Sequence, residues 1–169
     1  MDATGRLFDD ARLCQKADTL RKRTAQASFD GELFADHAVR GEDGILRNQA
    51  DYSEAGQYYA LLFGDLPLED DRYATLLAYV KTRFSGISLE QGDFEPADAF
   101  IGSALRVLCL MKLGEREVLK KDLCEIFGSM AERSETLWEH HAPSTSLDHG
   151  FASFIVLAID FVENFEENL

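Results

Sequence analysis

The sequence predicts an all-α fold of about six helices, arranged as three antiparallel hairpins. Apolar side chains recur at a helical period of 3.6 residues along most of the chain, and the chain has only three prolines. We find no Asn-Gly or Asp-Gly hairpin between alternating strands. With 169 residues, 46% of them hydrophobic, the chain is long enough for one core. We therefore expect a single domain over residues 1–169.

Six segments carry the helical pattern. The predicted helices span residues 7–27, 51–64, 69–84, 96–113, 115–133 and 146–162. Asp51 and Glu54 have capping-box spacing at the start of the second helix, which ends at Gly64. Pro96 occupies the favoured first turn of the fourth helix, and Gly114 follows its last turn.

Loop lengths and composition together predict two layers of helices. The links after the second and fourth helices are short, whereas those after the first, third and fifth are longer, so all three long loops are expected on one face. The second, fourth and sixth helices are apolar around most of their circumference, and the other three carry charge and a single apolar stripe. Small residues mark the apolar set, namely Gly56, Gly102, Ser103, Gly150 and Ser153. An inner row backed by an outer row predicts half of an (α/α)6 toroid, with a plain six-helix bundle or solenoid as the alternative.

Charge excludes two classes of partner. Seventeen basic and thirty-one acidic residues give a net charge of -14, which repels nucleic acid and anionic membrane surfaces. No apolar run approaches the roughly 20 residues that span a bilayer, and the N-terminus lacks the apolar core of a signal peptide. Cys14, Cys109 and Cys124 are odd in number and show no paired spacing, which argues against disulfides. We expect a soluble protein in a reducing compartment such as the cytoplasm.

The predicted shared face concentrates aromatic rings beside carboxylates, amides and imidazoles. Asp51 and Glu54 open the second helix, and Trp138, Glu139 and His149 lie on the third long loop and at the start of the sixth helix. Sugars stack their C–H faces on aromatic rings while their hydroxyls take directional hydrogen bonds. This combination therefore predicts a carbohydrate site.

Each of these residues also has a structural interpretation. Asp51 and Glu54 are suited to a helix cap, Trp138 to a core anchor and Glu139 to a solvated loop charge. The histidines at positions 140, 141 and 149 match no recognised ligand spacing. We therefore predict no metal and no cofactor.

Two segments of the third loop resemble a known signature. Thr136–Glu139 (T-L-W-E) followed by Ser146–Gly150 (S-L-D-H-G) resembles the T-[IL]-W-E … S-L-N-H pattern of family 78 glycoside hydrolases, the bacterial α-L-rhamnosidases. Phe34–Arg40 and Ser53–Tyr59 are similar to the F-x-D-N-A-V-R and S-E-x-x-Q-Y-Y-A segments of related six-hairpin proteins. The resemblance covers residues 29–159 and implies the C-terminal half of a six-hairpin catalytic barrel.

The resemblance implies an inverting glycoside hydrolase. Glu139 falls on the general base of that family and His149 on a sugar contact, while Trp138 is expected as the stacking platform. Asp148 and His37 each stand where the family pattern has asparagine, which leaves the sugar undefined.

The family barrel has six hairpins and this chain about three, so the general acid belongs to the other half. We expect a rhamnoside-like glycan as ligand, and as protein partner either another copy of the chain or a complementing N-terminal half. The alternative function is a non-catalytic helical carbohydrate-binding or interaction module.

Overall fold

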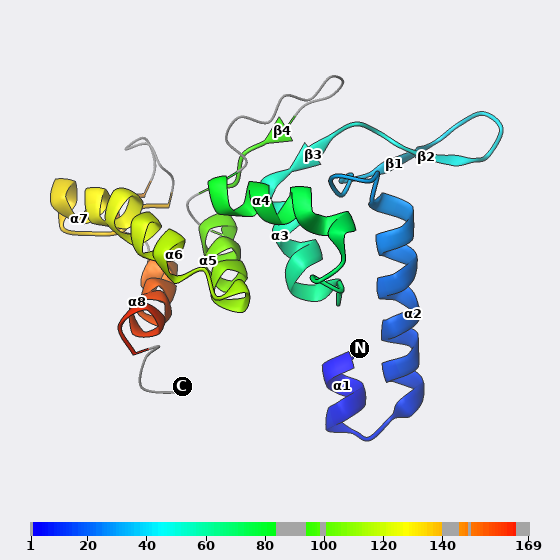
Figure 1. The fold of residues 1–169 in the computed structure, drawn as a ribbon, viewed down its shortest axis with the longest axis horizontal. Helices are drawn as coiled ribbons and strands as arrows, with labels where there is room; N and C mark the ends of the chain where they lie inside the picture. Colours follow the sequence, from blue (N-terminus) through cyan, green and yellow to red (C-terminus); the bar gives the residue numbers. More distant parts are fainter. Residues whose placement is uncertain (1, 84–93, 99–100, 140–145, 149, 165–169) are drawn as a thin grey trace.

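The computed structural model confirms the all-α fold class (Figure 1). It describes residues 2–83, 94–98, 101–139, 146–148 and 150–164. The helices are α1 Asp2–Leu7, α2 Ala11–Ser28, α3 Glu54–Phe63, α4 Ala74–Thr82, α5 Ile101–Leu113, α6 Arg116–Asp122, α7 Ser129–Ser134 and α8 Ile155–Asn164. Single-turn 3₁₀ segments, Asp71–Tyr73 and Gly150–Phe154, precede α4 and α8, and a π-helical segment, Leu123–Gly128, joins α6 to α7.

Capping residues set the helix starts that the sequence pattern misplaced. The helix predicted over residues 7–27 corresponds to α2 and begins later than expected, because Asp10 accepts hydrogen bonds from the backbone N–H groups of Arg12 (3.0 Å) and Leu13 (3.4 Å). Helix α1, which precedes it, was not predicted. The predicted capping box of the second helix is wrong. Ser53 is the N-cap of α3, since its hydroxyl accepts from the backbone N–H of Gly56 at 3.0 Å.

The structure also contains short strands that the sequence analysis did not predict. β1 Ala38–Arg40 pairs antiparallel with β2 Leu46–Asn48, and Gly44 in the turn has φ +77°. The prediction that no Asp-Gly turn lies between strands was wrong here. All six strand residues are exposed, so they lack the apolar and polar alternation by which a half-buried strand is recognised.

A second strand pair brings two of the long loops together. β3 Tyr52–Ser53 leads into α3 and runs parallel to β4 Phe94–Glu95, which precedes α5. The predicted helix start at Pro96 is therefore wrong, since β4 and an irregular segment occupy that position. The loops before α3 and α5 lie on one face, as loop parity predicted (Figure 1).

Helix α5 is the centre of the packing. It contacts α3 on one side and α8 on another, and α4 and α6 also pack against it. The row α3, α5 and α8 consists of the helices that composition assigned to the inner layer, and α4 and α6 belong to the predicted outer layer. Gly102 on α5 is buried, and a Cβ atom at that position would lie 2.4 Å from the Cβ of Ala97, so only glycine permits this close approach.

Two clusters of buried side chains form the core. The larger joins α3, α4, α5, α6 and α8 around fully buried residues such as Leu76, Leu110 and Ala158. The smaller contains Phe127, Met130 and Trp138. In α8, Ala158 is fully buried and Val162 nearly so, whereas 40% of Ile159 is exposed.

Candidate functional site

The two halves of the rhamnosidase-like signature meet in the structure. The backbone N–H of Glu139 donates to the carbonyl of Ser146 at 3.0 Å, and the hydroxyl of Thr136 donates to the carbonyl of Leu147. Residues 136–139 and 146–148 are thus held side by side after α7. His149, the expected sugar contact, lies outside the described residues.

Trp138 is a core anchor in this structure rather than an exposed platform. Only 4% of it is exposed, and its ring packs in the smaller core cluster with Phe127 and Met130. The indole N–H donates to the hydroxyl of Ser134 at 2.6 Å, and the guanidinium of Arg133 lies 5.8 Å from the ring centroid. The indole can therefore fix the backbone of the next residue, Glu139.

Glu139 is half-buried at the edge of this cluster. Its backbone is held on one side by the buried Trp138 ring and on the other by the hydrogen bond to Ser146. The backbone position of Glu139 is therefore defined by these contacts, and its side chain is partly shielded from solvent. A partly shielded carboxylate on a fixed backbone is compatible with a general base.

Asp51 lies at the exposed entrance to α3. Its carboxylate is 3.5 Å from Nε2 of His37, and 51% of each side chain is exposed. The backbone carbonyl of Asp51 accepts from the N–H of Asp36 at 3.0 Å, which ties the start of the loop to its end. This pair presents an acceptor and an imidazole to solvent, and both groups are able to bind hydroxyls.

Glu54 is buried and bonded within the protein. Only 2% of it is exposed, one carboxylate oxygen accepts from the backbone N–H of Ala97 at 2.8 Å, and the other accepts from the hydroxyl of Tyr58. Burial, together with this carboxylate, raises the pKa of Tyr58. Glu54 therefore connects α3 to the segment before α5 and is not accessible to a sugar in this structure.

A buried polar chain continues from Glu54 through the core. The hydroxyl of Tyr58 accepts from Arg106 at 3.3 Å, and the guanidinium of Arg106 pairs with Asp122 at 2.5 Å and also donates to the carbonyl of Val80. Arg106 is 2% exposed. Burial is the largest single influence and opposes its charge, but the interactions with Asp122 and Tyr58 together outweigh burial and raise the pKa of Arg106. The sequence analysis missed this network, although an arginine within the apolar face of α5 was its visible signal.

The predicted site residues fall into two groups that the structure does not bring into contact. Asp51 and Glu54 lie at the start of α3, whereas Trp138 and Glu139 follow α7. No hydrogen bond or ion pair within the described ranges joins the two groups, and α5 lies between α3 and α7 (Figure 1). Asp51 and Glu54 therefore have no direct bond to Trp138 or Glu139 in the described part of the chain.

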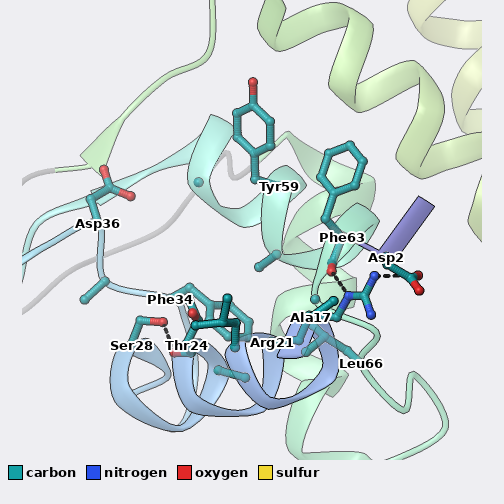
Figure 2. Close-up of a pocket in the computed structure, with 16 residues that line it drawn as sticks. Asp2, Ala17, Arg21, Thr24, Ser28, Phe34, Asp36, Tyr59, Phe63 and Leu66 are labelled. Carbon is teal, nitrogen blue, oxygen red and sulfur yellow. Dashed lines mark hydrogen bonds and ion pairs between the residues drawn. The ribbon is translucent and has the colours of Figure 1, made fainter. Parts of the chain in front are cut away.

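An apolar cavity of about 500 Å³ lies elsewhere, between α2 and α3 (Figure 2). Its walls include Leu20, Phe34 and the exposed rings of Tyr59 and Phe63. At one end Arg21 donates to the carbonyl of Phe63 at 3.2 Å and pairs with Asp2 at 2.8 Å. The sequence analysis did not predict this cavity, because α2 and α3 are separated by the long connection between them.

The structure gives no indication of a metal centre or a membrane span in its described part. Among those residues, no group of three or more His, Cys, Asp and Glu side chains is arranged to hold a metal ion. None of the described helices combines the length and apolar character needed to cross a bilayer. Comparisons with protein-family models, with curated proteins and with solved structures gave no match.

Proposed function

We propose that the chain is part of an inverting glycoside hydrolase of the α-L-rhamnosidase type and that Glu139 is its general base. The contact between the two halves of the signature carries this proposal, since Glu139 and Ser146 are bonded at 3.0 Å. The buried Trp138 ring supports it by anchoring the neighbouring carboxylate. In this proposal Trp138 positions the base instead of stacking on the sugar.

The base would act on water. In an inverting hydrolysis a carboxylate takes a proton from the water that attacks the anomeric carbon, while an acid on the opposite side of the sugar protonates the departing oxygen. The two carboxyl groups of such enzymes are about 6.5–9.5 Å apart. Glu54 is unsuitable as that acid, because both of its oxygens are bonded inside the core.

The general acid is therefore assigned to a partner, either a complementing polypeptide or another copy of the chain. The ligand is a rhamnoside-like glycan, with His149 as a contact to its hydroxyls. Asp51 and His37 are a second polar pair available to a longer glycan, since half of each side chain is exposed.

An activated substrate tests the base by itself. The 2,4-dinitrophenyl group leaves as a stable anion and needs no protonation, so 2,4-dinitrophenyl α-L-rhamnoside requires only the general base. We expect the chain to release dinitrophenolate, and Glu139→Gln to lower the rate by about 10²–10⁴-fold. Glu132→Gln, which changes an exposed carboxylate of α7, should leave the rate unchanged. Equal rates for Glu139→Gln and the unaltered chain would remove Glu139 from the mechanism.

A non-catalytic interaction module is the second candidate, and the apolar cavity between α2 and α3 favours it. That cavity involves neither Trp138 nor Glu139. A module of this kind would bind its partner without turnover, and Glu139→Gln would not change the affinity. Calorimetric titration with rhamnose and with a rhamnose disaccharide, beside the rate measurement, distinguishes the two candidates.

A further inference from the structure

Helix α5 exposes an apolar stripe on the side opposite the outer helices. Arg106 points toward the outer layer, where it pairs with Asp122 of α6 and donates to the carbonyl of Val80 in α4. Ile101 and Leu108, seven residues apart, are 44% and 42% exposed. At about 100° per residue they lie on the side of the helix roughly opposite Arg106.

The two neighbours of α5 in the inner row repeat this pattern. On α3, Tyr58 is buried toward Arg106, whereas Tyr59 and Phe63 are 49% and 60% exposed on the other side of the helix. On α8, Val156 and Leu157 are 65% and 57% exposed. Because α5 contacts both helices, these side chains belong to adjacent elements. We call this set the open face, and it consists of Tyr59, Phe63, Ile101, Leu108, Val156 and Leu157.

The open face has the dimensions of a protein interface. Helices pack about 8–10 Å apart and are about 10–12 Å wide, so the packed row of α3, α5 and α8 is roughly 30 Å across. The 13 residues of α5 extend for about 20 Å. The resulting footprint of roughly 600 Å² approaches the 800 Å² per partner of a standard protein interface. The six exposed apolar side chains lie on the helices of this footprint, and exposed apolar side chains on adjacent elements are typical of an interaction site.

The two ends of the row carry opposite charge. Helix α2 has five basic residues and one acidic residue, and its Lys16 and Arg23 are exposed. Helix α8 has no basic residue, and its Asp160 and Glu163 are exposed. Figure 1 shows α2 and α8 at opposite ends of the molecule.

We propose that the open face binds a second copy of this chain about a two-fold axis. A two-fold axis through the middle of a surface that is basic at one end and acidic at the other places α2 of each copy against α8 of its partner. The apolar middle of one copy then covers the apolar middle of the other. The net charge of -14 opposes association at long range, but salt screens this repulsion beyond about 8 Å at physiological ionic strength.

This proposal does not depend on the glycosidase activity and is tested by mass. Sedimentation equilibrium at physiological salt should give twice the chain mass of 19.0 kDa. Leu108→Glu should shift the protein to a monomer, because it buries a charge in the apolar centre of the interface. Ile45→Glu is the matched control: this residue is 56% exposed but lies in the β1–β2 turn, and the dimer should persist.

Charge reversal tests the pairing of α2 with α8 without touching the core. Lys16→Glu with Arg23→Glu, and separately Asp160→Lys with Glu163→Lys, should each weaken the dimer by about tenfold or more. Mixing the two double variants should restore dimerisation as a heterodimer, since both of its contacts again join opposite charges. Native mass spectrometry separates the three species. A monomeric unaltered chain at high micromolar concentration, or a mixture that forms no heterodimer, would overturn the proposal.

Discussion

Arg106 is the buried charge on which the packing of α5 against α4 and α6 depends most. Its guanidinium, 2% exposed, pairs with Asp122 and donates to the hydroxyl of Tyr58 and the carbonyl of Val80. We expect Arg106→Met to remove all of these bonds while it preserves most of the side-chain volume. The stability change should therefore report the polar contacts and not a cavity.

The size of the stability loss depends on the Asp122 carboxylate that Arg106→Met leaves without its partner. Asp122 is 8% exposed, and removing the partner of a buried ion pair costs about 3–5 kcal/mol, because an uncompensated charge remains. Arg83 lies 3.9 Å from the same carboxylate and offsets part of this cost. Single domains have a total free energy of unfolding of about 5–15 kcal/mol, so the variant should lose a large fraction of it.

Urea unfolding followed by far-ultraviolet circular dichroism measures this loss. Arg106→Met should lower the midpoint strongly, whereas Lys120→Met, on the exposed surface of α6, should change the free energy of unfolding by less than about 0.5 kcal/mol. Adding Asp122→Asn to Arg106→Met should recover part of the loss, since the unpaired charge disappears. The reasoning would be refuted if Arg106→Met lowered the free energy of unfolding by less than about 1 kcal/mol. It would also be refuted if the effects of Arg106→Met and Asp122→Asn simply added in the double variant.

Three further substitutions test other parts of the structure. Gly102→Val should destabilise the fold by about 1–3 kcal/mol in urea unfolding, because its Cβ would overlap Ala97 of the preceding segment; an unchanged midpoint would contradict the close approach. Asp30 accepts hydrogen bonds from the hydroxyl of Tyr52 and two backbone N–H groups; although burial opposes its charge, these bonds hold its pKa below the ordinary 3.8. The charged form of Asp30 thus stabilises the fold above pH 3.8, and Asp30→Asn should lower the free energy of unfolding by about 1 kcal/mol at pH 7. The stability difference between the variant and the unaltered chain should shrink as the pH falls through the lowered pKa of the folded state. Trp138→Phe should cost about 1 kcal/mol or more in the same assay by removing the indole hydrogen bond, and it should also lower the rate on the activated rhamnoside, since Glu139 loses its anchor; an unchanged rate would contradict the positioning role.

The fold class and the inner row of helices followed from the sequence because they depend on helical periodicity and on how much of each helix surface is apolar. Helix α2 is an exception, because composition assigned it to the outer layer whereas it flanks α3 across the apolar cavity. A helix with one apolar stripe faces one neighbour, and a helix that is apolar around its circumference faces several. This logic assigned α3, α5 and α8 to one row, and the structure shows α5 in contact with the other two. On the outer helices α4 and α6, Leu76 and Leu119 have no exposed surface, as a single apolar stripe facing the inner row requires.

Helix starts were less predictable, because several residues near each start are able to cap. Asp51 and Ser53 both favour an N-cap, and only the backbone path through β3 selects the serine. Asp10 caps α2, so this helix begins at Ala11 and not at the predicted Leu7, and α1 before it was not predicted. The β1–β2 hairpin was missed for a related reason: its short strands bury nothing and leave no pattern.

The candidate site was predicted in part. Residues that are close in sequence, such as Trp138 and Glu139, were recognised together through their motif, and its two halves do meet. The accessibility of each side chain depends on tertiary contacts that the motif does not encode. Glu54 is buried because Ala97 and Tyr58 bond its carboxylate, and both contacts require α3 and the segment before α5 to be in place.

The anomeric configuration of the first sugar released is the most direct test of the central claim that Glu139 activates water. Proton nuclear magnetic resonance can follow 2,4-dinitrophenyl α-L-rhamnoside before the product equilibrates. The account predicts β-L-rhamnose as the first product, formed by the unaltered chain and by Glu132→Gln but not by Glu139→Gln. Initial formation of α-L-rhamnose, or β-L-rhamnose formed at the same rate by Glu139→Gln, would contradict it.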